Sequence, residues 1–426
     1  RSEAFGGLKG VIARRADRAF ERTGEAGRAA LPRVFSHLVT VQDDGTATRR
    51  RTDKARWAGD AAAETLIAEF TKQDSRLLVV GPDRRPTVEV AHEALLREWP
   101  LLWDWIKDRR EALRLRDRIV AESKAWAEQG QPAFLLWKHE RLAPARALLE
   151  EADLLEPLAR DSQVADFLTP EADRLLAELA HGGTDHTRRE DIGRRLSEIG
   201  DPRPGVGVKN GVPDLLWRPI PAGEVTIEVH GRFAVAPFHL AAYPVTYAQY
   251  QTFLDAEDGY TSITWWDGLL HEPKSGLQLR RYGPQLRRYA NHPADRVIWY
   301  DAIAFCRWLS YRLGFEVRLP DEWEWQWAAQ SAHADFVYPW GPEWREGVAN
   351  TWEAGIGRTT AVGMYPEGRN LQDVYDLAGT VWEWCRSGYD PRNTMPEYGM
   401  GHGGSWNGDQ DSARADHRHM RFDPND

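Results

Sequence analysis

The sequences YDLAGTVWEWC (375–385) and GHGGSWNGDQDSARADHR (401–418) decide the fold of the second half of this chain. Gly379 precedes the alternating residues VWEW (381–384), which predict a half-buried strand that begins at a tight turn. Gly403 and Gly404 permit backbone conformations and close approaches that a larger side chain would block. Short polar residues follow the two glycines, spaced by arginines. The pattern indicates a rigid frame that displays a polar surface.

The composition is that of an ordinary globular protein. With 426 residues the chain is long enough for two or three domains, and its 42% hydrophobic and 28% charged residues are typical values. No apolar run approaches the roughly 18–20 residues of a membrane span, so we expect no transmembrane helix and no membrane partner. The net charge of −10 argues against a dominant nucleic-acid surface.

Two cysteines, Cys306 and Cys385, are too few for a disulfide framework. This fits a reducing compartment, and we expect a cytoplasmic protein. The first residues, RSEAFGGLKG, include neither an initiator Met nor the apolar stretch of a signal peptide. We therefore expect the chain to be part of a longer protein.

The order of helical and strand patterns predicts four regions. Residues 1–105 contain helices followed by a hairpin at 77–80 and 87–91, which is the order of a winged helix. Residues 106–200 are helical. The Pro- and Gly-rich sequence 201–214 predicts a linker, and 215–426 predicts an α+β domain. In this last domain, helices at 300–313 and 321–330, the second with Trp323 and Trp327 inward, would flank an antiparallel sheet.

The motifs LAGTVWEW and GGSWN, with Arg414 and Arg418 after them, resemble the formylglycine-generating-enzyme (sulfatase-modifying-factor) family. The resemblance implies a variant of the C-type lectin fold for 215–426. Further matching motifs lie upstream in the same order: IPAGEVTI (220–227), YPVTYAQYQTF (243–253), VIWYDAIAFCRWLS (297–310), RLPDEWEWQWAA (318–329) and ANTWEAGIGRTTAVGMYP (349–366).

The enzymes of this family oxidise a substrate cysteine with two cysteines that bind copper. Gly408 and Ala413 hold the corresponding positions here. Neither residue can supply the thiolate that acts as nucleophile and soft-metal ligand, so we expect no catalysis of this kind and no copper. The alternative is an oxidoreductase with an atypical site, in which His417 or His419 holds a metal.

Family resemblance also implies a structural Ca²⁺ site in the turn before the WEW sequence. Carried over residue by residue, Asp376 and Glu383 give carboxylates, and Gly379 and Val381 give carbonyl oxygens. Hard oxygen ligands in a tight turn suit calcium. The alternative is that Glu383 pairs with an arginine and Asp376 caps a turn.

The residues after the glycine pair mix aromatic side chains with adaptable polar groups, a composition that suits recognition of a protein or another macromolecule. The arrangement also resembles the variable proteins of diversity-generating retroelements, in which a C-terminal stretch of this fold is rewritten. The predicted ligand-binding residues are Trp406, Asn407, Asp409, Gln410, Asp411, Ser412, Asp416, His417, His419, Met420 and Phe422.

The sequences VEVAHEALLREWPLLWDWI (88–106) and LLWKHERLAPA (135–145) resemble the winged-helix and helical region of STAND-type signalling ATPases. The chain contains no G-x-x-x-x-G-K-[ST] sequence, so we expect the NTPase and effector domains upstream of Arg1. Arg49, Arg50 and Arg51 could contact nucleic-acid phosphates in a winged-helix DNA-binding regulator, but a solvated hairpin is the favoured interpretation. Our leading hypothesis is a non-catalytic sensor module of a bacterial signalling ATPase.

Overall fold

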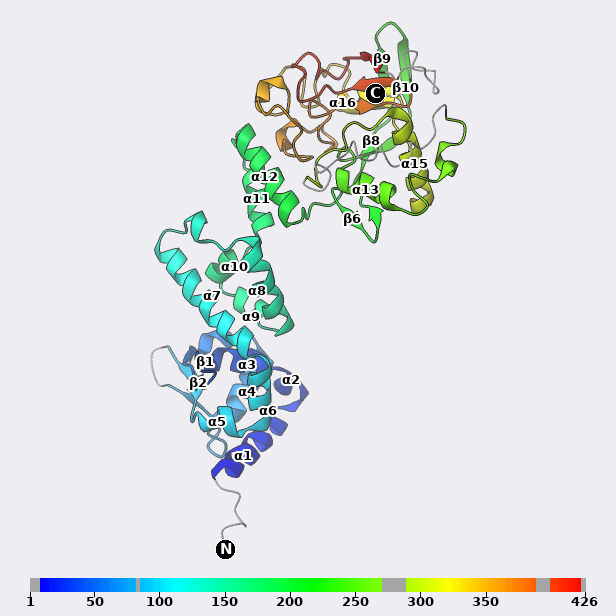
Figure 1. Cartoon of the computed structure of the whole chain (residues 1–426). Coiled ribbons are helices and arrows are strands. Elements are labelled where there is room, and N and C mark those ends of the chain that lie inside the picture. Colours follow the sequence, from blue (N-terminus) through cyan, green and yellow to red (C-terminus); the bar gives the residue numbers. More distant parts are fainter. Residues whose placement is uncertain (1–7, 82–84, 270–288, 388–398, 423–426) are drawn as a thin grey trace. The chain divides into compact units, whose positions relative to one another are not determined.

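The structure is a computed structural model that describes residues 8–81, 85–269, 289–387 and 399–422, with side chains for all of these except 8, 9 and 420–422. Contacts divide the chain into two compact units, Arg1–Glu171 and Ala172–Asp426 (Figure 1). We call them unit 1 and unit 2. No described helix is both long enough and apolar enough to cross a bilayer.

Unit 1 begins with four helices around a small antiparallel sheet. The predicted hairpin is confirmed, since β4 pairs with β5 and places Val79 opposite Glu89. A third strand, β3, pairs with the other edge of β5. The elements are α1 (Leu8–Arg22), α2 (Gly24–Ala29), α3 (Leu31–Leu38), β1 (Val39–Val41), β2 (Ala47–Arg49), β3 (Thr52–Asp53), η1 (Lys54–Trp57), α4 (Ala61–Thr71), β4 (Leu78–Val80) and β5 (Thr87–Val90).

The helices that follow the sheet share one hydrophobic core with it, which extends from Ala16 to Leu168. Arg116 on α7 is buried and donates to the carbonyl oxygens of Ser36 and Val39, so it ties α7 to the end of α3 and to β1. The expected division at residue 105 therefore falls inside one compact unit. These helices are α5 (Ala94–Glu98), α6 (Pro100–Asp108), α7 (Arg110–Glu128), η2 (Ala133–Leu135), α8 (His139–Glu151), α9 (Leu155–Ala159) and α10 (Ser162–Phe167).

Unit 2 starts upstream of the predicted linker. Helices α11 (Glu171–Ala180) and α12 (His186–Ile199) pack against Ala361, Met364 and Tyr365. The fit is close, because a Cβ atom at Gly193 of α12 would lie 2.7 Å from the Cβ of Ala361. The sequence 201–214, in which we predicted a linker, lies within unit 2, which begins at Ala172.

The rest of unit 2 is an α+β domain, as the sequence predicted. Its strands form antiparallel pairs β6–β7, β8–β11 and β9–β10 and the three-stranded sheet β12–β13–β14. The strands are β6 (Val208–Lys209), β7 (Val212–Pro213), β8 (Trp217–Ile220), β9 (Gly223–Ile227), β10 (Gly231–Val235), β11 (Phe238–Ala241), β12 (Glu383–Trp384), β13 (Gly399–His402) and β14 (His419–Phe422). The helices are α13 (Tyr247–Asp255), η3 (Ile263–Trp266), α15 (Trp299–Leu313), α16 (Glu322–Ala329), η5 (Trp352–Ala354) and η6 (Pro366–Gly368).

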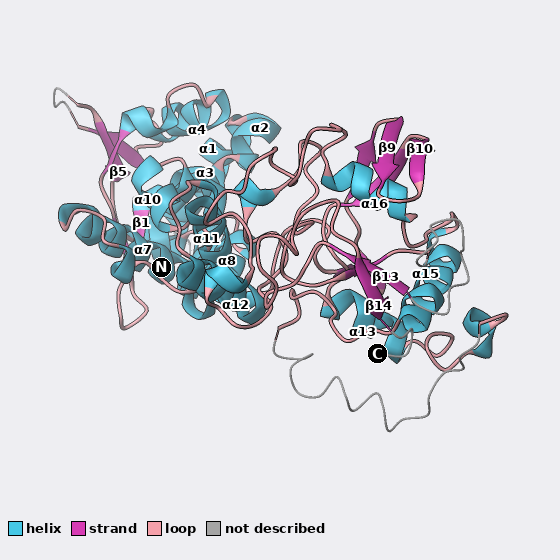
Figure 2. Ribbon diagram, turned by 90° about the horizontal axis from the view of Figure 1, so that it is seen from above, coloured by secondary structure: helices cyan, strands magenta, loops and turns pink. Residues whose placement is uncertain are grey.

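Helix α16 packs against the hairpin β9–β10, as Figure 2 shows. Asp321 and Glu324 form a capping box that begins the helix. Trp325 is fully buried and Trp327 nearly so, but Trp323 stacks on Phe233 in a partly exposed position. Trp323 thus packs against the core, as predicted, but at its edge, where the hairpin supplies an aromatic partner.

The strand predicted at 381–384 is shorter in the structure. The backbone N–H of Val381 donates to the carbonyl oxygen of Gly379 (2.9 Å), so the tight turn extends into the predicted strand. Only Glu383 and Trp384 pair with β13.

Candidate functional site

The two motifs that decide the fold are hydrogen-bonded to each other. The N–H of Gly379 donates to the carbonyl oxygen of Gly403 (2.6 Å), and that of Trp406 donates to Thr380 (3.2 Å). Gly404 has φ +74°, and a Cβ atom there would lie 2.9 Å from the carbonyl oxygen of Ser412. The glycine pair therefore lets the backbone after β13 fold closely over the turn before β12.

A buried ionic cluster lies beneath this backbone. Glu322 of α16 accepts hydrogen bonds from His402 Nε2 (3.1 Å) and from the guanidinium of Arg418 (Nη2 to Oε2, 3.0 Å). The side chains of Glu322 and His402 are fully buried, and that of Arg418 is 8% exposed. Burial acts to raise the pKa of Glu322, but the two hydrogen bonds outweigh it and hold the pKa below its ordinary value. The cluster joins α16, β13 and the start of β14.

The other arginine of the motif has a different environment. Arg414 forms a bidentate pair with Asp416 (2.9 Å for both bonds), and these side chains are 39% and 45% exposed. Such a pair is solvated and contributes little to stability. Of the two arginines, Arg418 therefore belongs to the frame and Arg414 to the surface.

Most predicted ligand-binding residues reach solvent. Asn407, Asp409, Gln410 and Asp411 are exposed, whereas Ala413, which follows them, is buried. We call these residues and their partly exposed neighbours the recognition face. Those neighbours are Trp406, Ser412, Asp416, His417 and His419; Met420 and Phe422 lie in β14, with their side chains outside the described residues.

The loop of the recognition face is held by short-range and long-range hydrogen bonds. Asp409 Oδ1 accepts from the N–H (3.0 Å) and hydroxyl (2.8 Å) of Ser412. Glu353 Oε1 accepts a hydrogen bond from the N–H of Gln410 (3.0 Å). The hydroxyl group of Tyr338 donates to the carbonyl oxygen of Gln410 (3.3 Å). The sequence did not assign Glu353 and Tyr338 to this surface, since the only signal was that Glu353 lies within the ANTWEAG motif.

His417 and His419 share an aromatic partner, Trp382. Trp382 stacks on His419 with ring centroids 4.6 Å apart, and its ring lies 5.9 Å from that of His417. Partial burial lowers the pKa of both histidines, and neighbouring imidazoles add to the effect. Within the described ranges, no group of three or more His, Cys, Asp or Glu side chains is placed to hold a metal ion.

The positions of the family's catalytic cysteines lie at the base of the recognition face. The carbonyl oxygen of Gly408 accepts from the N–H of Trp352 (2.8 Å), and Ala413 is fully buried. The two thiols of the chain are elsewhere. Cys306 and Cys385 are buried, and burial raises the pKa of Cys306 to about 12 and that of Cys385 well above its ordinary value. Neither is a ready thiolate.

Two carboxyl groups are buried in the turn before β12. Asp376 Oδ2 accepts from the N–H of Gly363 (2.6 Å), and Glu383 Oε2 accepts from the indole of Trp325 (3.0 Å). Glu383 Oε1 is buried without a hydrogen-bond partner among the described residues. The structure thus gives Glu383 an indole partner in place of the arginine of the alternative interpretation.

Burial raises the pKa of Asp376 to about 6 and that of Glu383 to about 8, and the charge of Asp376 contributes to the second shift. Two buried carboxyl groups that interact electrostatically, one of them with an oxygen that has no hydrogen-bond partner among the described residues, are groups that a bound cation would neutralise. By their chemistry, the two carboxyl groups suit a hard cation such as calcium.

Two of the three consecutive arginines at positions 49–51 form ion pairs within the protein. Arg50 pairs with Asp117 (2.9 Å) and Arg51 with Glu89 (3.1 Å). These contacts fit the interpretation of a solvated, internally paired hairpin rather than a phosphate-binding surface.

Two family models match the chain. Residues 218–424 match the sulfatase-modifying factor enzyme 1-like domain, and residues 2–133 match Novel STAND NTPase 1. With its α+β architecture, the second half is a domain of the sulfatase-modifying-factor type. The chain thus joins a region of the STAND NTPase family to a domain of the sulfatase-modifying-factor family, and the predicted fold class is confirmed.

Similar proteins have diverse names. The chain is 34% identical over 198 residues to "Serine/threonine-protein kinase pkn1" of Chlamydia pneumoniae. That alignment covers 43% of this chain and 30% of the kinase. It is 29% identical over 209 residues to "Inactive C-alpha-formylglycine-generating enzyme 2" of Mus musculus, in an alignment that covers 40% of this chain and 62% of that protein. The chain therefore spans less than two thirds of either relative.

Among solved structures, "Treponema denticola variable protein 1" is similar with a TM-score of 0.38 and 20% identity. The alignment covers 49% of this chain and 90% of that one.

Proposed function

We propose that the chain is the recognition part of a bacterial STAND-type signalling ATPase, and that its C-terminal domain binds a protein or another macromolecule without catalysis. The observation that carries the proposal is the absence of a usable thiol: Gly408 and Ala413 replace the family's cysteines, and both cysteines of the chain are buried. The exposed polar residues of the recognition face, on a hydrogen-bonded frame, supply the binding surface.

Incubation with a cysteine-containing sulfatase peptide, copper and oxygen tests the non-catalytic part of the proposal. We expect no peptide of the mass that corresponds to conversion of thiol to aldehyde, while a formylglycine-generating enzyme with both cysteines converts the peptide under the same conditions. Aldehyde formation by this chain, abolished by substitutions at the recognition face, would establish the oxidoreductase alternative.

We further propose that the recognition face is diversified between isolates. Sequencing the 3′ end of the gene in many isolates tests this proposal. If the face is rewritten, substitutions cluster at exposed positions such as Asn407 and Asp411 and spare Gly404, Ala413 and Arg418, which the frame requires. An invariant stretch indicates a sensor with one dedicated ligand.

We also propose that Asp376 and Glu383, with backbone oxygens of Gly379 and Val381, hold a structural calcium ion. The ion would neutralise the two buried carboxylates and so fix the turn that carries the recognition frame. Proton release accompanies binding, because Glu383 is mostly protonated at neutral pH.

Calcium is expected to stabilise unit 2 more at pH 8 than at pH 6. Without the ion, the raised pKa of Glu383 means that stability is full below its ordinary pKa of 4.5 and is lost as the pH rises toward 8. Ca²⁺ at about 100 times its dissociation constant should add about 2.7 kcal/mol, or roughly 5–10 °C in the melting temperature.

Differential scanning calorimetry in EDTA and in Ca²⁺ measures this shift. Glu383→Gln should abolish the response to calcium. Glu353→Gln, at a residue that contacts the loop of the recognition face, should retain that response. Equal melting temperatures in EDTA and in Ca²⁺, at both pH values, would contradict the proposed site.

A further inference from the structure

A cavity of about 690 Å³ lies in unit 2, beside strand β11. All four residues of this strand, Phe238, His239, Leu240 and Ala241, line the cavity. Successive side chains of a strand point to opposite faces of its sheet, so a cavity over one face would be lined by alternate residues only. The cavity therefore extends along an edge of β11. Since β8 occupies one edge, this is the other one, which we call the outer edge.

The outer edge of β11 carries backbone groups that β8 does not bind. The N–H of Ala242 donates to the carbonyl oxygen of Leu216 (2.7 Å), and bonded pairs alternate with non-bonded pairs along an antiparallel ladder. His239, which lies opposite Pro219, and Ala241 therefore belong to non-bonded pairs. The N–H and C=O groups of these two residues point away from β8. Among the described strands, only β8 pairs with β11.

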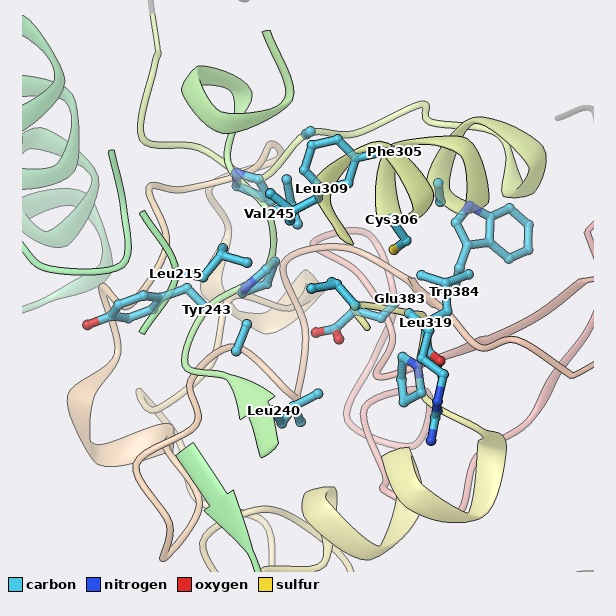
Figure 3. Close-up of a pocket in the computed structure, with 18 of the residues that line it drawn as sticks. Leu215, Leu240, Tyr243, Val245, Phe305, Cys306, Leu309, Leu319, Glu383 and Trp384 are labelled. Atoms are coloured by element: carbon cyan, nitrogen blue, oxygen red, sulfur yellow. The ribbon is translucent and has the colours of Figure 1, made fainter. Parts of the chain in front are cut away.

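Most of the remaining cavity wall is apolar. Figure 3 shows Phe305 and Leu309 of α15 and Leu319 around the same space as Leu240 of β11. An extended peptide suits this combination, because its backbone can pair with a strand edge while its apolar side chains fill the adjoining space. A compact small molecule would leave most of the strand edge without hydrogen bonds.

The charged groups of the lining are exposed, paired or part of another site. Glu316 and His239 are exposed, so they lie at the mouth of the cavity. Arg318 donates to Glu324 through both Nη atoms (both 2.7 Å). Glu383 belongs to the proposed calcium site and is assigned no role here. The exposed carboxylate of Glu316 favours a basic residue at one end of the bound peptide.

We propose that this cavity binds an extended peptide segment of a partner protein, which adds a strand to the outer edge of β11. The segment is apolar over about four residues, the length of β11, and carries a basic residue beside this apolar stretch. Its backbone exchanges hydrogen bonds with His239 and Ala241. No residue of the recognition face lines the cavity, so this second site does not depend on the function proposed above.

Two acetylated and amidated peptides, KKVIVI and KKLVLV, test the ligand class. Binding to the full chain is measured by calorimetry at pH 7.5, with the concentration of Ca²⁺ held constant because Glu383 also lines the cavity. We expect at least one peptide to bind with a dissociation constant below about 100 μM. Its analogue with two glutamates in place of the lysines should bind at least about threefold more weakly.

Backbone methylation distinguishes strand pairing from apolar packing. Only alternate residues of an added strand direct their N–H groups toward β11. Two isomers of the tighter peptide are compared, one N-methylated at the first and third apolar residues and the other at the second and fourth. We expect their affinities to differ at least about tenfold, because one isomer loses two hydrogen bonds to β11 and the other loses none. Equal affinities would overturn strand pairing.

Substitutions test the location. Ala241→Pro removes an N–H group that β8 does not bind and should weaken peptide binding at least about fivefold. Cys306→Phe fills the cavity and serves if the proline variant fails to fold. Cys385→Ala, at a buried thiol outside the lining, is the control and should bind the peptide as the parent does.

The proposal is wrong if neither peptide binds the parent chain below about 100 μM, or if a folded Ala241→Pro or Cys306→Phe variant binds it as tightly as the parent. Sedimentation of the full chain with and without peptide identifies another occupant. A dimer that the peptide dissociates would assign the cavity to a second copy of this chain and overturn the partner protein.

Discussion

Replacing Arg418 with methionine is expected to lower the free energy of unfolding of unit 2 by about 3–5 kcal/mol. The guanidinium is the cationic partner of Glu322, whose side chain is fully buried against His402. Removing it leaves a buried carboxylate with only the imidazole as a partner. Protonation of Glu322 would relieve part of the cost, and its pKa should therefore rise in the variant.

Arg414→Met is the matched control, because it removes the same charge from the same segment. Because the ion pair of Arg414 with Asp416 is partly exposed, this variant should lower the free energy of unfolding by less than about 1 kcal/mol. Urea unfolding of the full chain gives the free energies, and hydrogen exchange of amides in β13 and β14 assigns them to unit 2. Equal losses in the two variants would show that Arg418 is not a frame residue.

Gly379→Ala is expected to destabilise unit 2 by about 3 kcal/mol or more. Gly379 has φ +79°, and a Cβ atom there would lie 2.4 Å from the carbonyl oxygen of Asn350 and 3.0 Å from Cγ2 of Thr351. The alanine thus adds a backbone clash to the cost of a left-handed conformation, and such overpacking costs about 1–3 kcal/mol. The same shift should weaken calcium binding, because Gly379 supplies a proposed ligand.

The control here is Gly357→Ala. Gly357 has φ +70° but no atom within 4 Å of the position of a new Cβ, so only the conformational cost of about 1–2 kcal/mol applies. The difference between the two variants in urea unfolding measures the clash alone. No difference would mean that the turn relaxes away from Asn350.

Much of the C-terminal domain could be predicted from local patterns. The glycines 379, 403 and 404 adopt the positive φ angles that their positions suggested, and the helix expected at 300–313 is α15. These features depend on backbone conformations and periodicities that a few neighbouring residues encode. The strand at 381–384 was predicted too long, since hydrogen bonding within the turn competes with sheet pairing.

Contacts between distant segments were not predictable in this way. Arg414 and Arg418 look equivalent in the sequence, yet only Arg418 meets Glu322, which lies 96 positions away on α16. Glu353 reaches Gln410 across 57 positions. The packing of α12 on Ala361, Met364 and Tyr365 brings the helices before residue 201 into unit 2.

The sequence by itself therefore determined the resemblance to the family, the turn conformations and the absence of cysteine at positions 408 and 413, because these depend on residue identity at fixed positions. The tertiary structure decided which charges are buried, where the units divide and that Glu383 faces an apolar cavity. The physical reason is that desolvation and pairing depend on all atoms around a group, and most of those atoms belong to residues far away in the chain.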